Sequence, residues 1–222
     1  MKSSSRLRTP SELPDPIRHR LNMYVLAASA AGVGALALSQ PADAKIVYTK
    51  THRVIGFNQA YDLDLNHDKV TDFTIVNWEE CSDYCGQSIA EGAAPGNEAI
   101  GYRHLGLPFA SALKRGAEIG PHGYFQWPSA AMAGFDYTRG NGPWYNVTNR
   151  YLGLKFVIKG KIHYGWARLN VTGRKYPDAI ATLTGYAYET TPNKPIIAGK
   201  AKGPDVITVQ PVTPGTLAVG RR

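Results

Sequence analysis

The chain is poor in cysteine: Cys81 and Cys85, in the segment CSDYC, are the only two among its 222 residues. A redox-active Cys-x-x-Cys motif has two intervening residues, whereas this segment has three, so the redox interpretation fails. A structural zinc site needs further ligands, and no second cysteine pair is present. In an oxidising compartment the spacing predicts a small structural disulfide loop between Cys81 and Cys85.

Concentrated positive charge is also missing. The formal net charge is +8, from 25 Lys and Arg against 17 Asp and Glu, and these residues are scattered along the chain. A nucleic-acid-binding surface normally shows clustered Lys and Arg, and no such run occurs. We therefore expect no nucleic-acid partner.

Local signatures of catalysis are absent as well. The sequence has no His-Glu-x-x-His, no Gly-x-Ser-x-Gly and no phosphate-binding glycine loop, so we assign no catalytic residue. Acidic residues between Trp78 and Asp136 leave one enzymatic alternative open, because glycoside hydrolases use two carboxylates about 5–9 Å apart. Solvated loop charge is the other interpretation of these residues.

Long hydrophobic runs are lacking too. The longest apolar stretch, Met23 to Leu38, is rich in Ala and Gly and shorter than the roughly 20 residues that a spanning helix requires. It follows a basic lead and precedes PADA, which ends at Ala44. This order is typical of a secretory signal peptide, residues 1–44, cleaved after Ala44; a membrane anchor is the alternative. We expect a secreted or cell-surface protein without a stable membrane span in the mature chain.

What is present is a series of segments rich in Val, Ile, Thr and Tyr with polar and apolar residues in alternation. Such segments predict β-strands. Tyr164 and Trp166 should share one face of their strand, and Ala167 and Leu169 the other. A hairpin is expected around Gly160. The predicted strands are residues 45–57, 60–65, 70–78, 151–158, 162–171, 179–190 and 194–199.

These strands predict an all-β fold: one antiparallel β-sandwich or jelly-roll-like domain over residues 45–199. Residues 78–150 are dense in Gly, Pro and aromatics, and we expect loops and short strands there, with one helical turn at residues 109–116 closed by Gly116. Residues 200–222 are rich in Pro and Gly and predict a flexible C-terminal tail.

The segment DLDLNHDKVTDF, residues 62–73, joins two predicted strands and carries oxygen-bearing side chains at alternate positions. Calcium takes six to eight oxygen ligands, and a tight loop with this spacing can wrap one ion. Compared with an EF-hand loop, Lys69 replaces the glycine of the sharp turn and Ile75 replaces the bidentate glutamate. A solvated hairpin tip is the alternative, since Asn and Asp also favour turns. The expected calcium ligands are Asp64, Asn66, Asp68, the carbonyl of Val70, and Asp72.

Aromatic residues crowd the irregular middle of the chain. Flat aromatic rings stack on sugars, so exported β-proteins often bind glycans through loops of this kind. The alternative is that the rings close the open ends of the sandwich as part of its core. The candidate ligand-binding residues are Trp127, Tyr137, Trp144 and Tyr145.

Four phrases, ASALKRGAEIG, GPW, YLGLKFVIKGKIHYGWARL and GYAYETTPNKPIIAG, together resemble a group of bacterial exported proteins of unknown function. Many members carry a short C-terminal sorting signal of the PEP type. The resemblance covers roughly half of the mature chain and implies an exported, β-rich extracellular or surface protein, without assigning an activity. The end of this chain, TLAVGRR, keeps a basic terminus but lacks the hydrophobic helix of that signal. The matching positions are Tyr151, Gly153, Phe156, Tyr164, Gly165, Trp166, Ala187, Tyr188, Glu189, Ile196 and Gly199.

The sequence therefore favours a secreted or cell-surface non-enzymatic protein, binding or structural, stabilised by calcium. The alternative is an extracellular polysaccharide-active hydrolase or a glycan-binding module, with an extracellular glycan as its partner.

Overall fold

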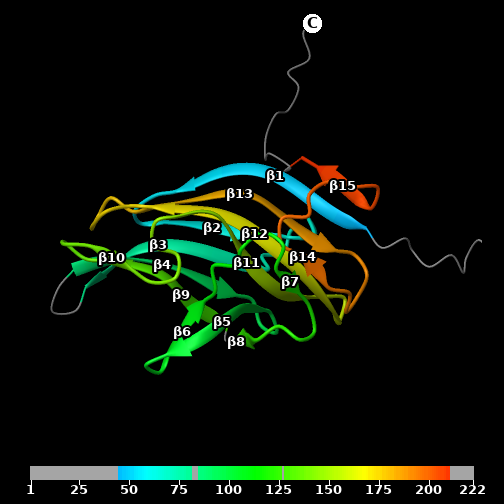
Figure 1. Ribbon diagram of the computed structural model, residues 1–222, viewed down its shortest axis with the longest axis horizontal. Coiled ribbons are helices and arrows are strands. Elements are labelled where there is room, and N and C mark those ends of the chain that lie inside the picture. Colours follow the sequence, from blue (N-terminus) through cyan, green and yellow to red (C-terminus); the bar gives the residue numbers. More distant parts are fainter. Residues whose placement is uncertain (1–44, 82–84, 127, 211–222) are drawn as a thin grey trace, which may run out of the picture. The chain divides into compact units, whose positions relative to one another are not determined.

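The computed structural model describes residues 45–81, 85–126 and 128–210 (Figure 1). The chain divides into a unit of residues 1–43 and a unit of residues 44–222, and the described residues belong to the second. They contain strands and no helix, so the all-β prediction is confirmed. Accordingly, no helix in this part of the chain is long and apolar enough to cross a membrane. The expected signal peptide lies outside the described residues.

The described residues form fifteen strands. These are β1 (Ile46–Ile55), β2 (Gln59–Leu63), β3 (Phe73–Cys81), β4 (Cys85–Ala93), β5 (Glu98–His104), β6 (Leu107–Ala110), β7 (Glu118–Ile119), β8 (Phe125–Gln126), β9 (Ser129–Phe135), β10 (Gly140–Asn141), β11 (Val147–Ile158), β12 (Lys161–Thr172), β13 (Ile180–Glu189), β14 (Ile196–Ile197) and β15 (Val206–Val209).

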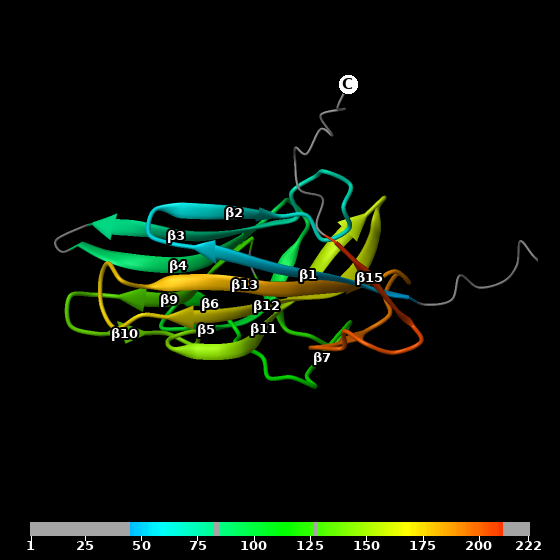
Figure 2. The same ribbon diagram turned by 90° about the horizontal axis from the view of Figure 1, so that it is seen from above.

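One large sheet contains all of these strands except β7 and β14, which pair with each other. Its order is β15-β1-β13-β12-β11-β5-β6-β9-β4-β3-β2, with β8 and β10 attached at its side. The sheet curls until β1 lies next to β2 and β3 (Figure 2). Most pairs are antiparallel, but β1 with β15 and β6 with β9 are parallel. The fold is therefore sandwich-like, with two facing halves of one mixed sheet in place of two separate sheets.

The main hydrophobic core fills the inside of the curl. Alternation along each strand directs one set of side chains inward, among them Phe73, Ile75, Phe156 and Leu169, all of them fully buried. Burial of apolar area at this scale is the dominant favourable contribution to folding.

Buried amides connect the two halves of the curl. Asn77 Nδ2 on β3 donates to the carbonyls of Ile55 and Ala179, at 3.0 Å each. Gln87 on β4 donates to Asn77 Oδ1 at 2.5 Å and accepts the Ala179 amide at 3.0 Å. Both side chains are almost completely buried. Because a buried polar group without a partner is costly, this mutual pairing favours one closure of the sheet over others.

A second hydrophobic cluster lies on the opposite face of β11 and β12. Tyr164 and Trp166 belong to it, whereas Ala167 and Leu169 belong to the main core, so the predicted division of β12 between two faces is confirmed. Gly165 allows β13 to pack closely, because a Cβ there would lie 2.7 Å from the carbonyl oxygen of Ala187. Residues from the loops around β7, β8 and β14 cover this second face.

Two local expectations are wrong. Residues 109–116 form no helical turn: Phe109 and Ala110 end strand β6, and Gly116 takes a positive φ of 90° in a loop. The middle of the chain contains three strands of seven or more residues, β4, β5 and β9, beside the expected loops and short strands. Residues 206–209, expected in the flexible tail, form β15 and pair with the first strand of the sheet. The rest of that tail, residues 211–222, lies outside the described residues.

Candidate functional site

The carboxylate loop, residues 64–72, connects β2 and β3 as the sequence predicts. The two strands pair antiparallel up to Leu63 and Phe73, and both of these side chains are fully buried. The amide of Asp72 donates to the carbonyl of Leu63 at 2.9 Å and closes the base of the loop. Leu65 is also buried, so apolar anchors fix the entry and exit of the loop and leave its polar residues near the surface.

Side-chain oxygens of the loop face its own backbone amides. Asp64 accepts hydrogen bonds from the amides of Asp68 at 3.2 Å and Lys69 at 2.7 Å. Asn66 Oδ1 accepts from the Asp68 amide at 3.3 Å, and Asp68 Oδ1 from the Val70 amide at 2.9 Å. The side-chain oxygens of Asp64, Asn66 and Asp68 therefore turn toward the backbone of their own loop. Each oxygen has two lone pairs, so these hydrogen bonds leave acceptor capacity for a cation.

Lys69, which stands where an EF-hand loop has glycine, does not prevent the sharp turn. Lys69 adopts a φ of 73° and His67 a φ of 63°. Both values lie in the left-handed region, which glycine adopts more easily than other residues. His67 is held by a contact of 2.8 Å between its Nε2 and Thr49 Oγ1 on β1. Lys69 thus makes the turn, and its backbone is strained because a residue with a side chain is disfavoured in the left-handed region.

Asp72 ties the end of the loop to its start. Its Oδ2 accepts the amide of Leu65 at 2.8 Å, and its side chain is buried. Burial raises the pKa of Asp72 to about 6, against the lowering effect of the Leu65 amide, and the negative charges of Asp64 and Asp68 raise it further. The same cluster of negative charge adds to the burial that raises the pKa of the Tyr188 hydroxyl. The loop therefore concentrates negative charge that would be stabilised by a cation.

Lys69 does not neutralise this charge by an ion pair. Within the described ranges, ion pairs join Lys155 to Glu98, Lys194 to Glu189 and Lys200 to Asp205, and Lys69 belongs to none of them. The hairpin-tip alternative rests on Asn and Asp side chains that bond their own backbone, and the hydrogen bonds of Asp64, Asn66 and Asp68 are of this kind.

The donor set fits a weak calcium site. Asp64, Asn66, Asp68, Asp72 and the carbonyl of Val70 would supply five oxygens, and water would complete the shell of six to eight. The position of the bidentate glutamate is taken by Ile75, which is fully buried and offers no oxygen. The loop aspartates do not form a group of three with ligand atoms within 4.8 Å of one another, so an ion would have to draw them together.

Glu79, Cys81 and Cys85 do form such a group in the described part of the chain. The two cysteines are joined by a disulfide with Cα atoms 4.1 Å apart, as the sequence predicts, so their sulfurs are not free thiolates. Glu79 also accepts a hydrogen bond from the Tyr176 hydroxyl. This proximity therefore makes no metal centre.

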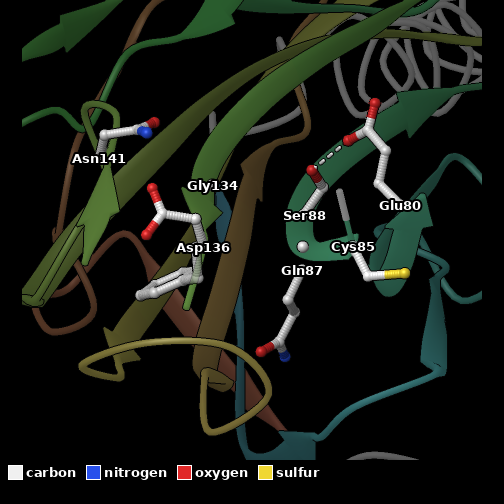
Figure 3. Close-up of a pocket in the computed structure, with 9 residues that line it drawn as sticks. Glu80, Cys85, Gln87, Ser88, Gly134, Asp136 and Asn141 are labelled. Atoms are coloured by element: carbon white, nitrogen blue, oxygen red, sulfur yellow. Dashed lines mark hydrogen bonds between the residues drawn. The ribbon is translucent and has the colours of Figure 1, made fainter. Parts of the chain in front are cut away.

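A small open hollow of about 280 Å³ beside β4 and β9 tests the hydrolase alternative. Figure 3 shows Glu80 and Asp136 on opposite sides of it, with Ser88 Oγ donating to Glu80 at 2.5 Å. Asp136 accepts hydrogen bonds from Thr138 and Arg139, and those from Thr138 lower its pKa most. An acid catalyst needs a raised pKa, so this carboxylate is suited to fixing a turn and not to donating a proton.

The four aromatic candidates do not form one surface. Trp144 is fully buried, and its Nε1 donates to the carbonyl of Ala110 at 2.9 Å, so its assignment to ligand binding is wrong. Tyr145 is half-buried and packs against the core, and Trp127 lies outside the described residues. Tyr137 is 58% exposed and contacts the ring of Tyr176, with centroids 5.0 Å apart. Tyr176 comes from a distant segment, and the sequence offered no signal that would pair it with Tyr137.

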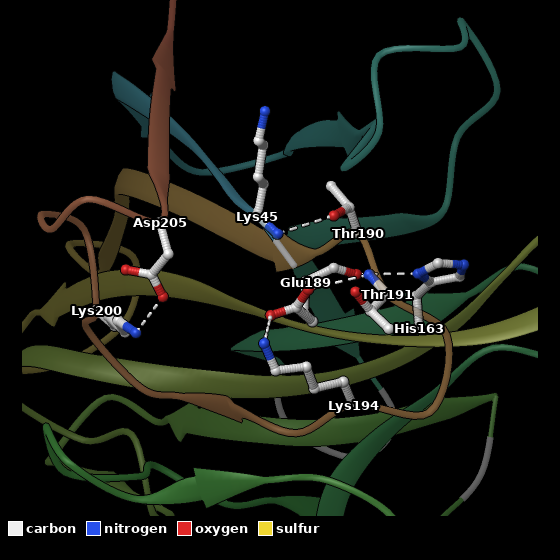
Figure 4. A network of polar contacts seen from close by, with 8 residues as sticks. All are labelled: Lys45, His163, Glu189, Thr190, Thr191, Lys194, Lys200 and Asp205. Carbon is white, nitrogen blue, oxygen red and sulfur yellow. Dashed lines mark hydrogen bonds and ion pairs between the residues drawn. The ribbon is translucent and has the colours of Figure 1, made fainter. Parts of the chain in front are cut away.

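Several residues that carry the family resemblance have structural roles. Tyr151, Phe156 and Trp166 are buried in the two hydrophobic clusters. Figure 4 shows Glu189, which is almost fully buried, accepting the Thr191 amide at 3.0 Å and pairing with Lys194 at 3.3 Å. These contacts explain why the fold requires those residues, and they assign no activity to them.

Comparison of the chain with models of protein families, with curated protein sequences and with solved structures finds no match.

Proposed function

We propose that this chain is a secreted or cell-surface, non-enzymatic protein, structural or ligand-binding, in which calcium stabilises the carboxylate loop. The observation that carries the proposal is the electrostatic state of that loop. The pKa of Asp72 is raised to about 6, partly by the charges of Asp64 and Asp68. The described residues give these aspartates no ionic partner, so a divalent cation would relieve their repulsion.

Calcium would rigidify the loop and supply no chemistry. The side-chain oxygens of Asp64, Asn66 and Asp68 lie on one loop and bond its backbone amides, and a cation would draw them closer together. With five protein oxygens and no bidentate glutamate, the dissociation constant should be about 10⁻⁴ to 10⁻³ M, which is the range of extracellular calcium modules. Such an affinity suits a compartment where calcium is abundant.

Two features support export. The Cys81–Cys85 disulfide is of the kind that forms and persists in oxidising compartments. The resemblance to exported bacterial proteins with PEP-type sorting signals points in the same direction.

Thermal unfolding in 10 mM CaCl₂, in 10 mM MgCl₂ and in EDTA tests the calcium proposal. For a dissociation constant of about 1 mM, 10 mM calcium should stabilise the native state by about 1.4 kcal/mol. For a domain of this size we expect the melting temperature to rise by roughly 3–6 °C over EDTA. Magnesium should give less than half of this shift, because it demands a tighter octahedral shell.

Asp68→Asn and Asp62→Asn form a matched pair for this experiment. Both remove one negative charge from an exposed side chain of the same hairpin, but Asp62 accepts its hydrogen bond from Thr74 and lies outside the ligand set. Asp68→Asn should lose most of the calcium shift, and Asp62→Asn should keep it. A melting temperature that is the same in calcium and in EDTA for the unmodified protein would refute the calcium site.

A further inference from the structure

A basic groove runs beside β1, the strand whose Thr49 also contacts His67 of the carboxylate loop. It consists of two hollows that share Lys50. The larger, of about 620 Å³, is lined by Tyr48, Lys50, Arg115, Gly116, Arg168 and residues 197–202. The smaller, of about 410 Å³, is lined by residues 50–53 and by Gln210, directly after β15. The two hollows adjoin at Lys50, and together they offer more room than one small-molecule site.

The groove collects positive charge from four separate segments of the chain. Its lining contains His52 and six Lys or Arg side chains, and no Asp or Glu lines either hollow. Lys200 pairs with Asp205 (Figure 4), and it is the only one of the six that takes part in the ion pairs found within the described ranges. The six are Lys50, Arg53, Arg115, Arg168, Lys200 and Lys202. A concave surface lined by one sign of charge focuses its field and attracts anions.

Two adjacent β-bulges build the groove. The pairing of β1 with β13 shifts between Lys50 and Arg53, and the pairing of β12 with β13 shifts next to Arg168. Both shifts occur at Gly185, which pairs with Lys50 on one side and Arg168 on the other. A bulge interrupts the alternation of side chains, so Lys50, His52 and Arg53 are all exposed on one short stretch.

Arg168 is positioned in advance for an anion. Its Nε donates to Thr184 Oγ1 at 2.8 Å and its Nη2 to the Thr184 carbonyl at 2.9 Å. Thr184 Oγ1 in turn donates to the carbonyl of Arg168 at 3.1 Å. The guanidinium has five N–H donors, so up to three can serve a ligand. Because the side chain is already fixed and half-buried, binding a carboxylate would cost little rotamer entropy.

We infer that the basic groove binds an acidic polysaccharide, a chain of sugars carrying carboxylate or sulfate groups. Two adjoining hollows with cations in both fit repeated negative charges on an extended chain better than one small anion. Nucleic acid fits less well: Tyr48 is the only Phe, Tyr or Trp in the lining and is 8% exposed, so unpaired bases would have no ring on which to stack. The inference rests on the proposed export, because the protein would meet such a polymer outside the cell. It does not depend on calcium.

Binding of the full chain to polygalacturonate and to dextran sulfate, with neutral dextran as the reference, tests the inference. The titrations contain EDTA, so that calcium cannot bridge protein and polymer and so that a failure of the calcium proposal does not affect the result. Both acidic polymers should bind, with affinity falling as NaCl rises from 50 to 300 mM, and neutral dextran should not. Equal binding of neutral dextran would overturn the inference.

A matched pair of triple variants locates the binding. Lys50→Gln with Arg115→Gln and Lys202→Gln removes three exposed cations of the groove. Lys159→Gln with Lys161→Gln and Lys175→Gln removes three exposed cations elsewhere. We expect the groove variant to bind polygalacturonate about tenfold or more weakly, and the control to change less than about twofold. Equal loss in both variants would show general charge attraction and would overturn the groove.

Two competition experiments address other ligands. Inorganic phosphate at the same concentration of negative charge should displace polygalacturonate poorly; efficient displacement would indicate a single-anion site and overturn the inference. A single-stranded DNA oligonucleotide should bind more weakly than both acidic polysaccharides, and tighter binding would make nucleic acid the ligand. Circular dichroism spectra of both variants should match that of the unmodified protein, since all six side chains are exposed.

Discussion

Glu91 gives the sharpest prediction about the energetics of this domain. It lies on β4, is fully buried, and neither of its carboxylate oxygens has a hydrogen-bond partner within the described part of the chain. Burial raises its pKa to about 8, against the lowering effect of the Ala130 amide. At neutral pH the folded protein therefore holds this side chain as the uncharged acid.

The sign and size of the effect follow from proton linkage. The ordinary pKa of this carboxyl is 4.5 and the folded value is about 8, so between these values the folded state binds a proton that the unfolded state releases. Stability therefore falls as the pH rises through this window. At about 1.4 kcal/mol per pKa unit, Glu91 should lower the free energy of unfolding by on the order of 5 kcal/mol between pH 4 and pH 9.

Urea unfolding at several pH values, followed by circular dichroism, measures this contribution. Glu91→Gln keeps the shape of the side chain but cannot ionise, and all other groups cancel in the difference from the unmodified protein. The free energy of unfolding of the variant, relative to that of the unmodified protein, should rise by about 5 kcal/mol between pH 4 and pH 9. Glu118→Gln, an exposed change on β7, serves as the control and should run parallel to the unmodified protein. Parallel curves for Glu91→Gln as well would refute the reasoning.

Three further predictions concern the loop and the closure of the sheet. Lys69→Gly should raise the free energy of unfolding by about 1 kcal/mol in urea titrations with calcium, because glycine removes the strain of the positive φ. Calcium affinity, measured by calorimetry, should fall steeply below pH 6, because the proton that binds Asp72 competes with the ion. Asn77→Ala should cost about 3 kcal/mol in urea unfolding, because the Ile55 carbonyl loses the Asn77 donor and Gln87 loses the Asn77 acceptor, while the Ala179 carbonyl keeps its donor from Gln87.

The regular parts of the fold could be predicted because their side chains alternate clearly. β11 and β12 carry large apolar residues on a period of two and are joined at Gly160, whose φ of 75° suits the turn. The carboxylate loop was predicted as a hairpin for the same reason, since Leu63, Leu65 and Phe73 mark the buried positions on both sides. In each case the residues that decide the structure are neighbours in the sequence.

The irregular parts depended on contacts that the sequence does not reveal. β4 and β9 are built largely from Ala, Gly and Ser, which leave a weak periodic pattern, and they become strands because their neighbours in the sheet complete them. Trp144 was a candidate for ligand binding, with core packing as the alternative, and the structure buries it with its indole N–H donating to the carbonyl of Ala110, 34 residues earlier. β15 forms in a segment rich in Pro and Gly because its short apolar run pairs with β1.

The basic groove could not be predicted either. Its cations come from residues 50–53, from Arg115, from Arg168 and from Lys200 and Lys202, and none of these segments is a basic run by itself. Gly185 on β13 lies between two of the four segments, since it pairs with Lys50 on one side and with Arg168 on the other. Basic residues that are scattered along the sequence are thus close together on the surface of the folded domain.

Mass spectrometry of the protein recovered from fractions of the cells that produce it tests the central claim of export most directly. If the account is right, the chain outside the cytoplasm begins at Lys45 and has the mass of a form in which Cys81 and Cys85 are joined. An intact chain that retains Met1, stays in the cytoplasm and carries two free thiols would contradict it.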